Sequence, residues 1–382
     1  MKILFVGLGG VPYSKRAADI RLRFFADAIK DGGNEAIALN RYPFPKTEEP
    51  YGGFSKIIEL FSPQRRKSPA LYVLAYFKEF RAILRENRIG KVDVLHVYSG
   101  HFIDLVFYYL ISRIIGAKTV YSYVEFRSGI PRKGMYARVN AWLIDGWGCR
   151  FFDGAIPISA FLEAHVKKQR GADFPECKVP PICDFGYFSK IPGDESGGKY
   201  ILFCGSAEYR EVIDLILAAY LKTTRLRETT RLKLVLGGKK EAREALRNEY
   251  PGEVEIVSGL PYEELIKAYQ GAEALLIPLR DTIQDAARFP NKVCEYVAAR
   301  GLIITTKFGE MPYFFEDGKT ALVADDFSVD AIAQKLSCLT EMSDRECNRI
   351  RETCYRKGQK SFDYRAHVEP LKHFFERVVS EK

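Results

Sequence analysis

The sequence of 382 residues contains two successive series of alternating strand-like and helix-like segments. One series begins with the apolar run 2–6, and the other begins with the apolar run 200–204. Short apolar runs that alternate with amphipathic segments are typical of β/α units, because each helix carries the chain back to the start of the next parallel strand. The sequence therefore predicts an α/β protein of two Rossmann-like domains that face each other across a cleft.

The two series are separated at residues 178–199, where three prolines and a polar glycine-rich stretch interrupt the periodicity. Such a density of proline and glycine ends regular elements and marks a linker. We expect an N-terminal domain at 1–185 and a C-terminal domain at 186–362, with a final helix at 363–382 that completes the first domain. The length also suits two domains of ordinary size.

Apolar periodicity predicts the individual elements. In the first domain we expect a helix that starts near residue 17 and stops at the glycine pair 32–33, a Pro/Gly-rich excursion at 43–68, strands at 2–6, 35–39, 92–97, 118–123 and 154–157, and helices at 69–87 and 102–115. In the second we expect a helix at 211–220 and strands at 200–204, 232–236, 254–257, 274–278 and 302–305. The final helix, at about 364–379, follows the second domain.

The positive charge is concentrated in the first half of the chain. Residues 1–190 contain 29 Lys and Arg against 18 Asp and Glu, a net charge of +11, and the rest contain 29 against 31, a net charge of −2, which together give +9. A basic half attracts anionic partners. We therefore expect the first domain to meet a nucleic acid, a membrane surface or a phosphorylated acceptor.

The basic cluster Arg65-Arg66-Lys67 precedes an apolar and aromatic stretch at 70–77. One interpretation is a core helix with a solvated basic face. Another is a segment that lies on an anionic membrane surface, where basic flanks and an apolar face act together. No DNA- or RNA-binding motif accompanies the charge, so nucleic acid is the weakest of the three interpretations and we predict no nucleic-acid partner.

Several classes of protein are excluded by what the sequence lacks. The eight cysteines include no C-x-x-C pair and the five histidines no pair four residues apart, so we expect buried free thiols and no metal site. No apolar run reaches the roughly 20 residues that span a bilayer. The sequence opens in a strand pattern without the layout of a signal peptide, so we expect a cytoplasmic protein.

The first loop contains Gly7, Gly9 and Gly10 and resembles part of the dinucleotide fingerprint G-x-G-x-x-G. The third glycine is replaced by Pro12, and the second strand runs into Asn40 rather than an acidic residue, so an NAD(P) site is a minor alternative. Two glycines before a helix still offer backbone N–H groups to an anion. Gly9 and Gly10 are therefore candidate anion-binding residues.

The second half carries the most specific pattern. Pro290, Lys292, Glu295 and Tyr296 stand at fixed spacing, and an apolar strand, Gly309-Glu310-Met311-Pro312 and Glu316-Asp317-Gly318 follow them. This pattern resembles the donor-site signature of the retaining nucleotide-sugar glycosyltransferases of family 4, which have the GT-B fold. Weaker similarities, in the family's order, extend the resemblance across nearly the whole chain.

The resemblance implies roles for particular residues. Glu295 binds the donor ribose hydroxyls, and Lys292, with Arg210 as the nearest further cation, faces the diphosphate. Other implied donor-binding residues are Gly9, Gly10, Leu260 and Asn291. On the acceptor side the resemblance points to Glu125 and Arg127. Without the surrounding pattern, a Glu and a Lys three apart on a helix read as a solvated ion pair.

The sequence departs from the family at three places. Ala287 stands where a first glutamate contacts the donor sugar, and Val124 stands where an acceptor-side histidine is common. The usual phosphate-binding Arg and Lys near the start of the second domain are Ser206 and Glu211. These departures keep a catalytically silent sugar-nucleotide-binding subunit as an alternative.

The resemblance implies a retaining glycosyltransferase that uses a nucleotide-diphosphate sugar, with UDP favoured. The expected acceptor is a saccharide or lipid-linked saccharide of cell-envelope polysaccharide or glycoconjugate synthesis. No D-x-D carboxylate cluster is present, so we expect electrostatic stabilisation of the leaving diphosphate without a metal or other cofactor. A lipid-linked acceptor and the basic first domain also predict peripheral association with the inner face of the cell membrane.

Overall fold

The computed structural model describes residues 1–11, 17–42, 53–61, 69–193, 198–250, 252 and 254–381. The chain divides into a first unit, made of Met1–Ile182, Ala287–Asn291 and Tyr364–Lys382, and a second unit, made of Cys183–Ala286 and Lys292–Asp363. We expected residues 287–291 in the second domain, whereas their contacts group them with the first unit.

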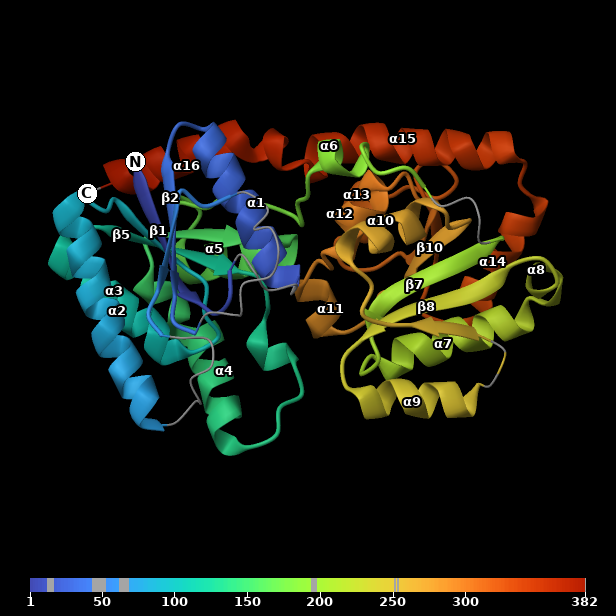
Figure 1. Ribbon diagram of the computed structural model, residues 1–382, viewed down its shortest axis with the longest axis horizontal. Helices are drawn as coiled ribbons and strands as arrows, with labels where there is room; N and C mark the ends of the chain where they lie inside the picture. The colour runs from blue at the N-terminus through green and yellow to red at the C-terminus, as the bar shows by residue number, and fades with distance from the viewer. Residues whose placement is uncertain are drawn as a thin grey trace. The chain divides into compact units, whose positions relative to one another are not determined.

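The first unit is built on a parallel sheet (Figure 1). Its strand order is β3-β2-β1-β4-β5-β6, and in register Ile3 of β1 stands opposite Ala36 on one side and Val94 on the other. The central strands are almost entirely apolar because helices cover both faces of such a sheet. The strands are β1 Lys2–Leu8, β2 Glu35–Asn40, β3 Lys56–Glu59, β4 Val94–Val97, β5 Lys118–Tyr123 and β6 Gly154–Pro157.

The helices of the first unit include one from the far end of the chain. Phe374, Phe375 and Val378 of α16 belong to the same buried cluster as Ile3 and Phe5 of β1. The helical elements are α1 Ala17–Asp31, α2 Pro69–Ile89, α3 Phe102–Ile115, η1 Arg127–Gly129, α4 Met135–Trp147, η2 Gly148–Phe151, α5 Ala160–Arg170, η3 Tyr364–His367 and α16 Val368–Ser380.

The second unit repeats the architecture of the first. Its parallel sheet has the order β12-β11-β10-β7-β8-β9, and its core joins Leu276, Ile304 and Leu336 with the apolar face of α7. The strands are β7 Tyr200–Ser206, β8 Arg231–Gly237, β9 Val254–Val257, β10 Ala274–Ile277, β11 Ile303–Thr306 and β12 Leu322–Ala324. The helices are α6 Phe185–Phe188, α7 Arg210–Lys222, α8 Thr224–Arg227, α9 Lys240–Glu249, α10 Tyr262–Gln270, α11 Ile283–Ala287, α12 Lys292–Ala298, α13 Met311–Phe314, α14 Val329–Glu341 and α15 Asp344–Phe362.

The predicted fold class, α/β with two Rossmann-like domains, is confirmed by these two sheets. The excursion predicted at 43–68 contains β3, an edge strand whose outer residues Lys56 and Glu59 are exposed and give no apolar run. The predicted final helix begins as the 3₁₀ turn η3. The helix α4 was not predicted, because apolar residues are spread around it and hide its periodicity.

Strand order in both units reverses beside the first strand. The reversal lies between β1 and β4 in the first unit and between β7 and β10 in the second. In open parallel sheets, ligands bind outside the carboxyl ends of the strands at this topological switch point. The loops after β1, β4, β7 and β10 are therefore where functional side chains are expected.

Candidate functional site

The Lys292–Glu295 pair lies in the second unit, at the first turn of α12. The Lys292 Nζ lies 3.0 Å from Oε2 of Glu295, and only 5% of the Glu295 side chain is exposed. The other residues of α12 are buried, so the helix is fixed along its whole length. The pair is therefore not the solvated ion pair that the two residues alone would suggest.

Tyrosines from the neighbouring helix α10 surround the Glu295 carboxylate. Tyr262 Oη lies 3.5 Å from Oε1, and Tyr269 Oη lies 3.4 Å from Oε2, the long limit of hydrogen bonds. Tyr296 accepts a hydrogen bond from the backbone N–H of Cys204 at 3.0 Å, which ties α12 to β7. Burial lowers the pKa of Lys292, but the Glu295 carboxylate outweighs it and raises that pKa above its usual value. Lys292 is therefore a cation held beside a buried anion.

The other two donor-binding residues predicted in the second half flank these helices in sequence. Leu260 is half-buried and follows Gly259, whose φ of +74° turns the chain from β9 toward α10. Asn291 immediately precedes α12 and is grouped with the first unit. Leu260 thus leads into the helix that supplies Tyr262.

Arg210, the second predicted cation, is the first residue of α7 and is bound by two carboxylates. Its Nε lies 2.6 Å from Asp214, and its Nη2 lies 2.6 Å from Glu249. The hydrogen bond to Glu249 is the main cause that raises the pKa of Arg210. All three side chains are substantially exposed, so ligand phosphate can compete for this guanidinium.

A further cation, Arg280, stands at the switch point of the second sheet. It follows β10, and it binds Asp285 through Nε at 2.9 Å and Nη2 at 3.0 Å. Its Nη1 reaches Glu211 on α7 at 3.3 Å. Asp285 is buried, and its hydrogen bond is the main cause that raises the pKa of Arg280. Arg280 is not among the site residues predicted from the sequence, because its partners are not apparent from spacing.

The residues that depart from the family pattern have ordinary structural roles. Ser206, at the end of β7, donates a hydrogen bond to Glu208. Glu211 is neutralised by Arg280 rather than left as an isolated negative charge. Ala287 is buried, and its carbonyl accepts a hydrogen bond from Ser159 at 2.5 Å. Position 287, where the family has a glutamate, therefore supplies no carboxylate.

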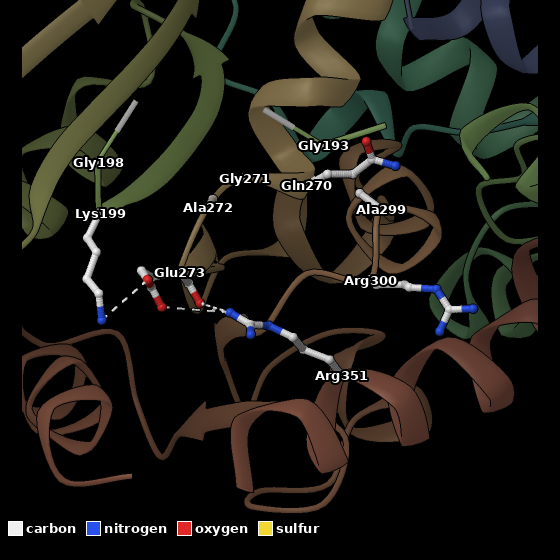
Figure 2. A pocket seen from close by; sticks show the side chains of 10 residues that line it. All are labelled: Gly193, Gly198, Lys199, Gln270, Gly271, Ala272, Glu273, Ala299, Arg300 and Arg351. Atoms are coloured by element: carbon white, nitrogen blue, oxygen red, sulfur yellow. Dashed lines mark hydrogen bonds and ion pairs between the residues drawn. The ribbon is translucent and has the colours of Figure 1, made fainter. Parts of the chain in front are cut away.

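A cavity of about 610 Å³ lies at the opposite, amino edge of the second sheet (Figure 2). Lys199 and Arg351 both pair with Glu273 in its wall, at 3.8 and 4.0 Å. Its lining residues include none of the predicted site residues. Because ligands of parallel sheets bind at the carboxyl edge, we do not assign the donor to this cavity.

A second cavity, of about 430 Å³, lies at the switch point of the first sheet. Its walls come from the loops after β1, β4 and β5. Gly9, Glu125 and Arg127 all line it, together with Val124. Gly10 follows in the same loop with a φ of +111°. One donor-side and both acceptor-side predictions thus meet in this cavity.

Asp145 of α4 holds the loop that carries Glu125 and Arg127. Its carboxylate accepts hydrogen bonds from the backbone N–H of Ser128 at 2.6 Å and from Tyr123 Oη at 3.0 Å. The Arg127 guanidinium lies 3.9 Å from Glu125 and packs over Gly100, where an added Cβ would come within 2.7 Å of it. Burial lowers the pKa of Arg127, but Tyr121 and Glu125 outweigh it and raise that pKa above its usual value. Arg127 therefore stays positively charged.

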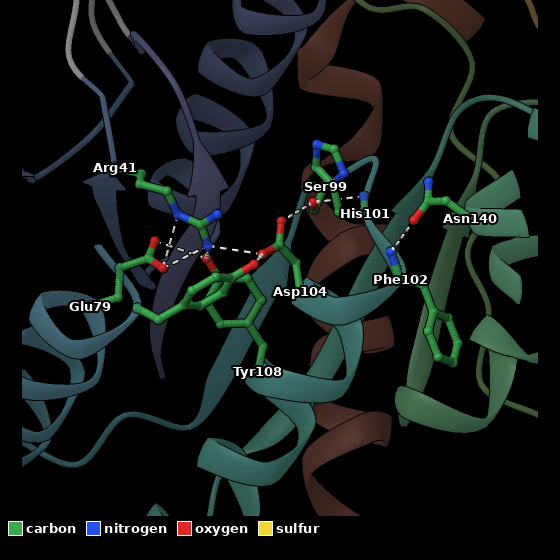
Figure 3. Close-up of polar contacts among 9 residues, drawn as sticks. Arg41, Glu79, Ser99, His101, Phe102, Asp104, Tyr108 and Asn140 are labelled. Carbon is green, nitrogen blue, oxygen red and sulfur yellow. Dashed lines mark hydrogen bonds and ion pairs between the residues drawn. The ribbon is translucent and has the colours of Figure 1, made fainter. Parts of the chain in front are cut away.

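A buried charge cluster supports the other side of this cavity (Figure 3). Arg41 binds Glu79 through Nε at 3.1 Å and Nη2 at 2.7 Å, and Nη2 also lies 3.0 Å from Asp104. Tyr108 Oη donates to Glu79 at 2.9 Å, and Ser99 donates to Asp104. Burial is the largest cause that raises the pKa of Glu79. Sequence reasoning missed this cluster because its members lie tens of residues apart.

The membrane prediction rests in part on residues without a structural description. Arg65, Arg66 and Lys67 lie outside the described residues. In the adjoining α2, Tyr72, Val73 and Phe77 are exposed, so they are not core. Among the described residues, no helix combines the length and apolar character needed to cross a bilayer.

Comparison with known families gives a direct match. Residues 198–342 match the model of the family described as glycosyl transferases group 1. This range covers most of the second unit, including Lys292, Glu295, Arg210 and Arg280. A search of curated proteins gave no match.

Solved structures match over the whole chain at low sequence identity. A sucrose-phosphate synthase from Thermosynechococcus elongatus has a TM-score of 0.77 at 14% identity, with 99% of this chain and 98% of that chain covered. HepE from Anabaena, in complex with UDP and glucose, has a TM-score of 0.72 at 13% identity, with 99% and 100% covered. A glycosyltransferase from Rickettsia africae has a TM-score of 0.70 at 14% identity, with 100% and 99% covered. Residues 198–342 therefore carry a group 1 glycosyl transferase domain, and the whole chain has the fold of these glycosyltransferase structures.

Proposed function

We propose that this glycosyltransferase moves a sugar from a UDP-sugar to a saccharide or lipid-linked saccharide, with retention of the anomeric configuration. The observation that carries the proposal is the Glu295 carboxylate, which is buried beside Lys292 within the family-matched segment. A buried carboxylate is costly unless it is paired and hydrogen-bonded. A site that keeps one beside a lysine suits a ligand with hydroxyls and phosphates.

The preference for a uracil nucleotide rests on similar structures. HepE was crystallised with UDP and with UDP-glucose, and an Escherichia coli trehalose-6-phosphate enzyme was crystallised with UDP-2-fluoro glucose. We infer the same donor class for this chain. Glu295 would accept hydrogen bonds from the ribose hydroxyls, with Leu260 and Asn291 beside the nucleotide.

Charge stabilisation explains how the residues would act. As the glycosidic bond to the donor breaks, negative charge builds on the leaving diphosphate and positive charge builds on the sugar. Lys292 and Arg210 of the second unit would stabilise that diphosphate. This arrangement needs no metal or other cofactor.

The acceptor is assigned to the first-unit cavity. Glu125 and Arg127 line it, and both can hydrogen-bond to sugar hydroxyls, whereas only the Arg127 guanidinium can donate to a phosphate. The basic charge of the first half favours a phosphate-bearing acceptor. We infer a role in cell-envelope polysaccharide or glycoconjugate synthesis at the inner face of the cell membrane.

Calorimetric titration with UDP, UDP-glucose, GDP-mannose and ADP-glucose tests the donor. Wild type should bind at least one UDP ligand more tightly than the other nucleotides. Glu295→Ala should weaken that binding at least about tenfold, because charge-assisted hydrogen bonds contribute roughly 1.5–3 kcal/mol each. Glu295→Gln retains the size of the side chain and reports on the charge alone.

Glu352→Ala is the matched control, since Glu352 is a half-exposed glutamate of the same unit that pairs with Arg300. It should leave donor affinity unchanged. Thermal melting without ligand checks that each variant folds. Equal donor affinity for folded Glu295→Ala and wild type would refute the donor site, and UDP-sugar binding without transfer or hydrolysis would favour a silent subunit.

A further inference from the structure

The helix α4 presents apolar side chains to solvent. Met135 is 82% exposed, Tyr136 71%, Trp142 58% and Val139 47%. Met135, Val139 and Trp142 are spaced four and three residues apart, so they lie on one face of the helix. A surface helix of a soluble protein normally presents polar residues there.

The opposite face of α4 is buried against the first unit. Ala141, Ile144 and Asp145 are buried, and Asp145 is engaged with the loop after β5. The face of α4 that packs against the rest of the unit is therefore a different one from the exposed apolar face. The exposed face is a second apolar surface on the same helix, and nothing among the described residues covers it.

Basic residues flank this face in the sequence. Residues 126–144 include four basic residues and no acidic residue. Lys133 and Arg138 are exposed, and Arg132 is partly exposed. An apolar face with Trp and Tyr, flanked by Lys and Arg, is the pattern of a helix that lies in the interface of an anionic bilayer.

A second apolar surface lies toward the same side of the first unit. In α2, Val73 is 73% exposed and Phe77 55%, and Tyr72 is exposed beside them. Figure 1 shows that the amino-terminal ends of α2 and α4 both reach the lower edge of the first unit. The exposed residues of α2 lie in the half of the helix that reaches this edge.

The acceptor cavity adjoins both helices. Tyr72 of α2 lines it, and Asn140 of α4 donates a hydrogen bond from Nδ2 to the carbonyl of Gly100, another lining residue, at 2.9 Å. The same Asn140 accepts from the backbone N–H of Phe102 at 2.9 Å, as Figure 3 shows. The position of α4 is thus coupled to the wall of the cavity.

We propose that the apolar face of α4, formed by Met135, Tyr136, Val139 and Trp142, inserts into the interface of an anionic bilayer. The exposed residues of α2 provide a second contact, and the acceptor cavity then opens beside the lipid headgroups. The docking itself does not depend on the donor, but its purpose, access to a lipid-linked acceptor, rests on the function proposed above.

Co-sedimentation of the full chain with vesicles tests the docking. Vesicles of phosphatidylcholine with phosphatidylglycerol should bind the protein, and vesicles of phosphatidylcholine alone should bind it much less. Met135→Gln/Trp142→Gln should reduce the fraction bound by about tenfold, because two interfacial anchors are lost. Lys133→Gln/Arg138→Gln should reduce binding at low salt by about fivefold per charge and should make it less sensitive to added salt.

Ile114→Gln is the matched control. Ile114 is 66% exposed, but it lies near the carboxyl end of α3, far along the chain from α4 and next to the turn at Gly116. This variant should bind vesicles as wild type does. Tryptophan emission from wild type should also shift to shorter wavelength with anionic vesicles, and this shift should be lost in Trp142→Phe.

Three results would overturn the proposal. These are no binding to anionic vesicles at low salt, equal loss of binding in Ile114→Gln and in the α4 variants, and a concentration-dependent dimer that Met135→Gln/Trp142→Gln dissolves. The last result would assign the face to a second copy of the chain. UDP titration of the same variants separates this test from the donor assignment, because the α4 changes should leave UDP affinity unchanged.

Discussion

Arg41 and Glu79 form a two-contact ion pair in the interior of the first unit, with Nε and Nη2 of the arginine both bound to Oε2 of the glutamate. The Glu79 side chain is fully buried, and that of Arg41 is 9% exposed. The pair supports the cavity wall through Asp104, so its effect extends from stability to the candidate acceptor site.

Glu79→Ala should lower the free energy of unfolding by about 3–5 kcal/mol, because it leaves a buried guanidinium short of a carboxylate. Urea denaturation measures this change. Glu244→Ala removes an exposed pair with Lys240 and should cost less than about 1 kcal/mol. Equal costs for the two variants would show that the buried cluster is unimportant for stability.

Gly7→Ala should destabilise the first unit more than Gly33→Ala. Both glycines have a φ near +77°, so both substitutions carry the left-handed penalty of about 1–2 kcal/mol. At Gly7 an added Cβ would also lie 2.7 Å from the Tyr98 carbonyl oxygen, whereas at Gly33 nothing lies within 4 Å. Thermal unfolding of the two variants isolates the contact at the carboxyl end of β1, and equal melting temperatures would contradict it.

Glu86 should make the first unit sensitive to acid. Burial raises the pKa of Glu86, but Lys56 and Lys2 outweigh it and lower that pKa below its usual value of 4.5. A carboxyl with a lowered pKa stabilises the folded state above pH 4.5, and that contribution is lost as the pH falls through the folded pKa.

Denaturant unfolding at pH 7 and at pH 3.5 to 4 measures this contribution. Glu86→Gln should be less stable than wild type at pH 7 and should lose less stability on acidification. Glu59→Gln, at an exposed position of β3, should retain the wild-type dependence. The explanation fails if wild type and Glu86→Gln show the same loss of stability on acidification.

Lys292→Ala should slow turnover more than it weakens donor binding. The ammonium is held beside Glu295 in the ground state, and negative charge on the diphosphate grows only as the bond to the sugar breaks. Steady-state kinetics should therefore show a larger fall in kcat than rise in KM. Lys292→Arg retains the charge and should recover part of the rate. A change confined to KM would mean that Lys292 contributes only to ground-state binding.

Arg210→Ala and Arg280→Ala should separate two roles for cations of the second unit. Arg210 is exposed with Asp214 and Glu249, so its loss should reduce the rate with little effect on stability. Loss of Arg280 removes the guanidinium that neutralises the buried Asp285 and should cost about 3–5 kcal/mol of stability. Melting curves and rates measured on both variants check this division, and an unchanged rate for Arg210→Ala would remove it from the diphosphate site.

Local patterns in the sequence predicted most strands of the two sheets. The strand at 118–123 and the helix at 102–115 have the predicted bounds. The helix is a mostly apolar segment that ends at Gly116, which adopts the left-handed conformation. The edge strand β3 was missed, since half-exposed strands carry no apolar run. The exposed face of α4 was also missed, because the helix itself was not predicted.

The candidate site was predictable only where the chain carries a local motif. Lys292 and Glu295 are three residues apart, so their contact follows from helix geometry. The pairing of Arg280 with Glu211 and of Arg41 with Asp104 depends on how loops after different strands are brought together. Spacing along the sequence contains no direct information on such pairs.

The place of α16 in the first unit has a consequence for protein synthesis. Leu371, Phe374 and Phe375 cover the sheet that begins with β1, although they are made more than 300 residues later. The nascent first unit therefore emerges from the ribosome with an uncovered apolar surface, and it keeps that surface while the second unit is translated. Exposed surface of this kind favours aggregation and chaperone binding. The first unit completes its fold only after the second has been made.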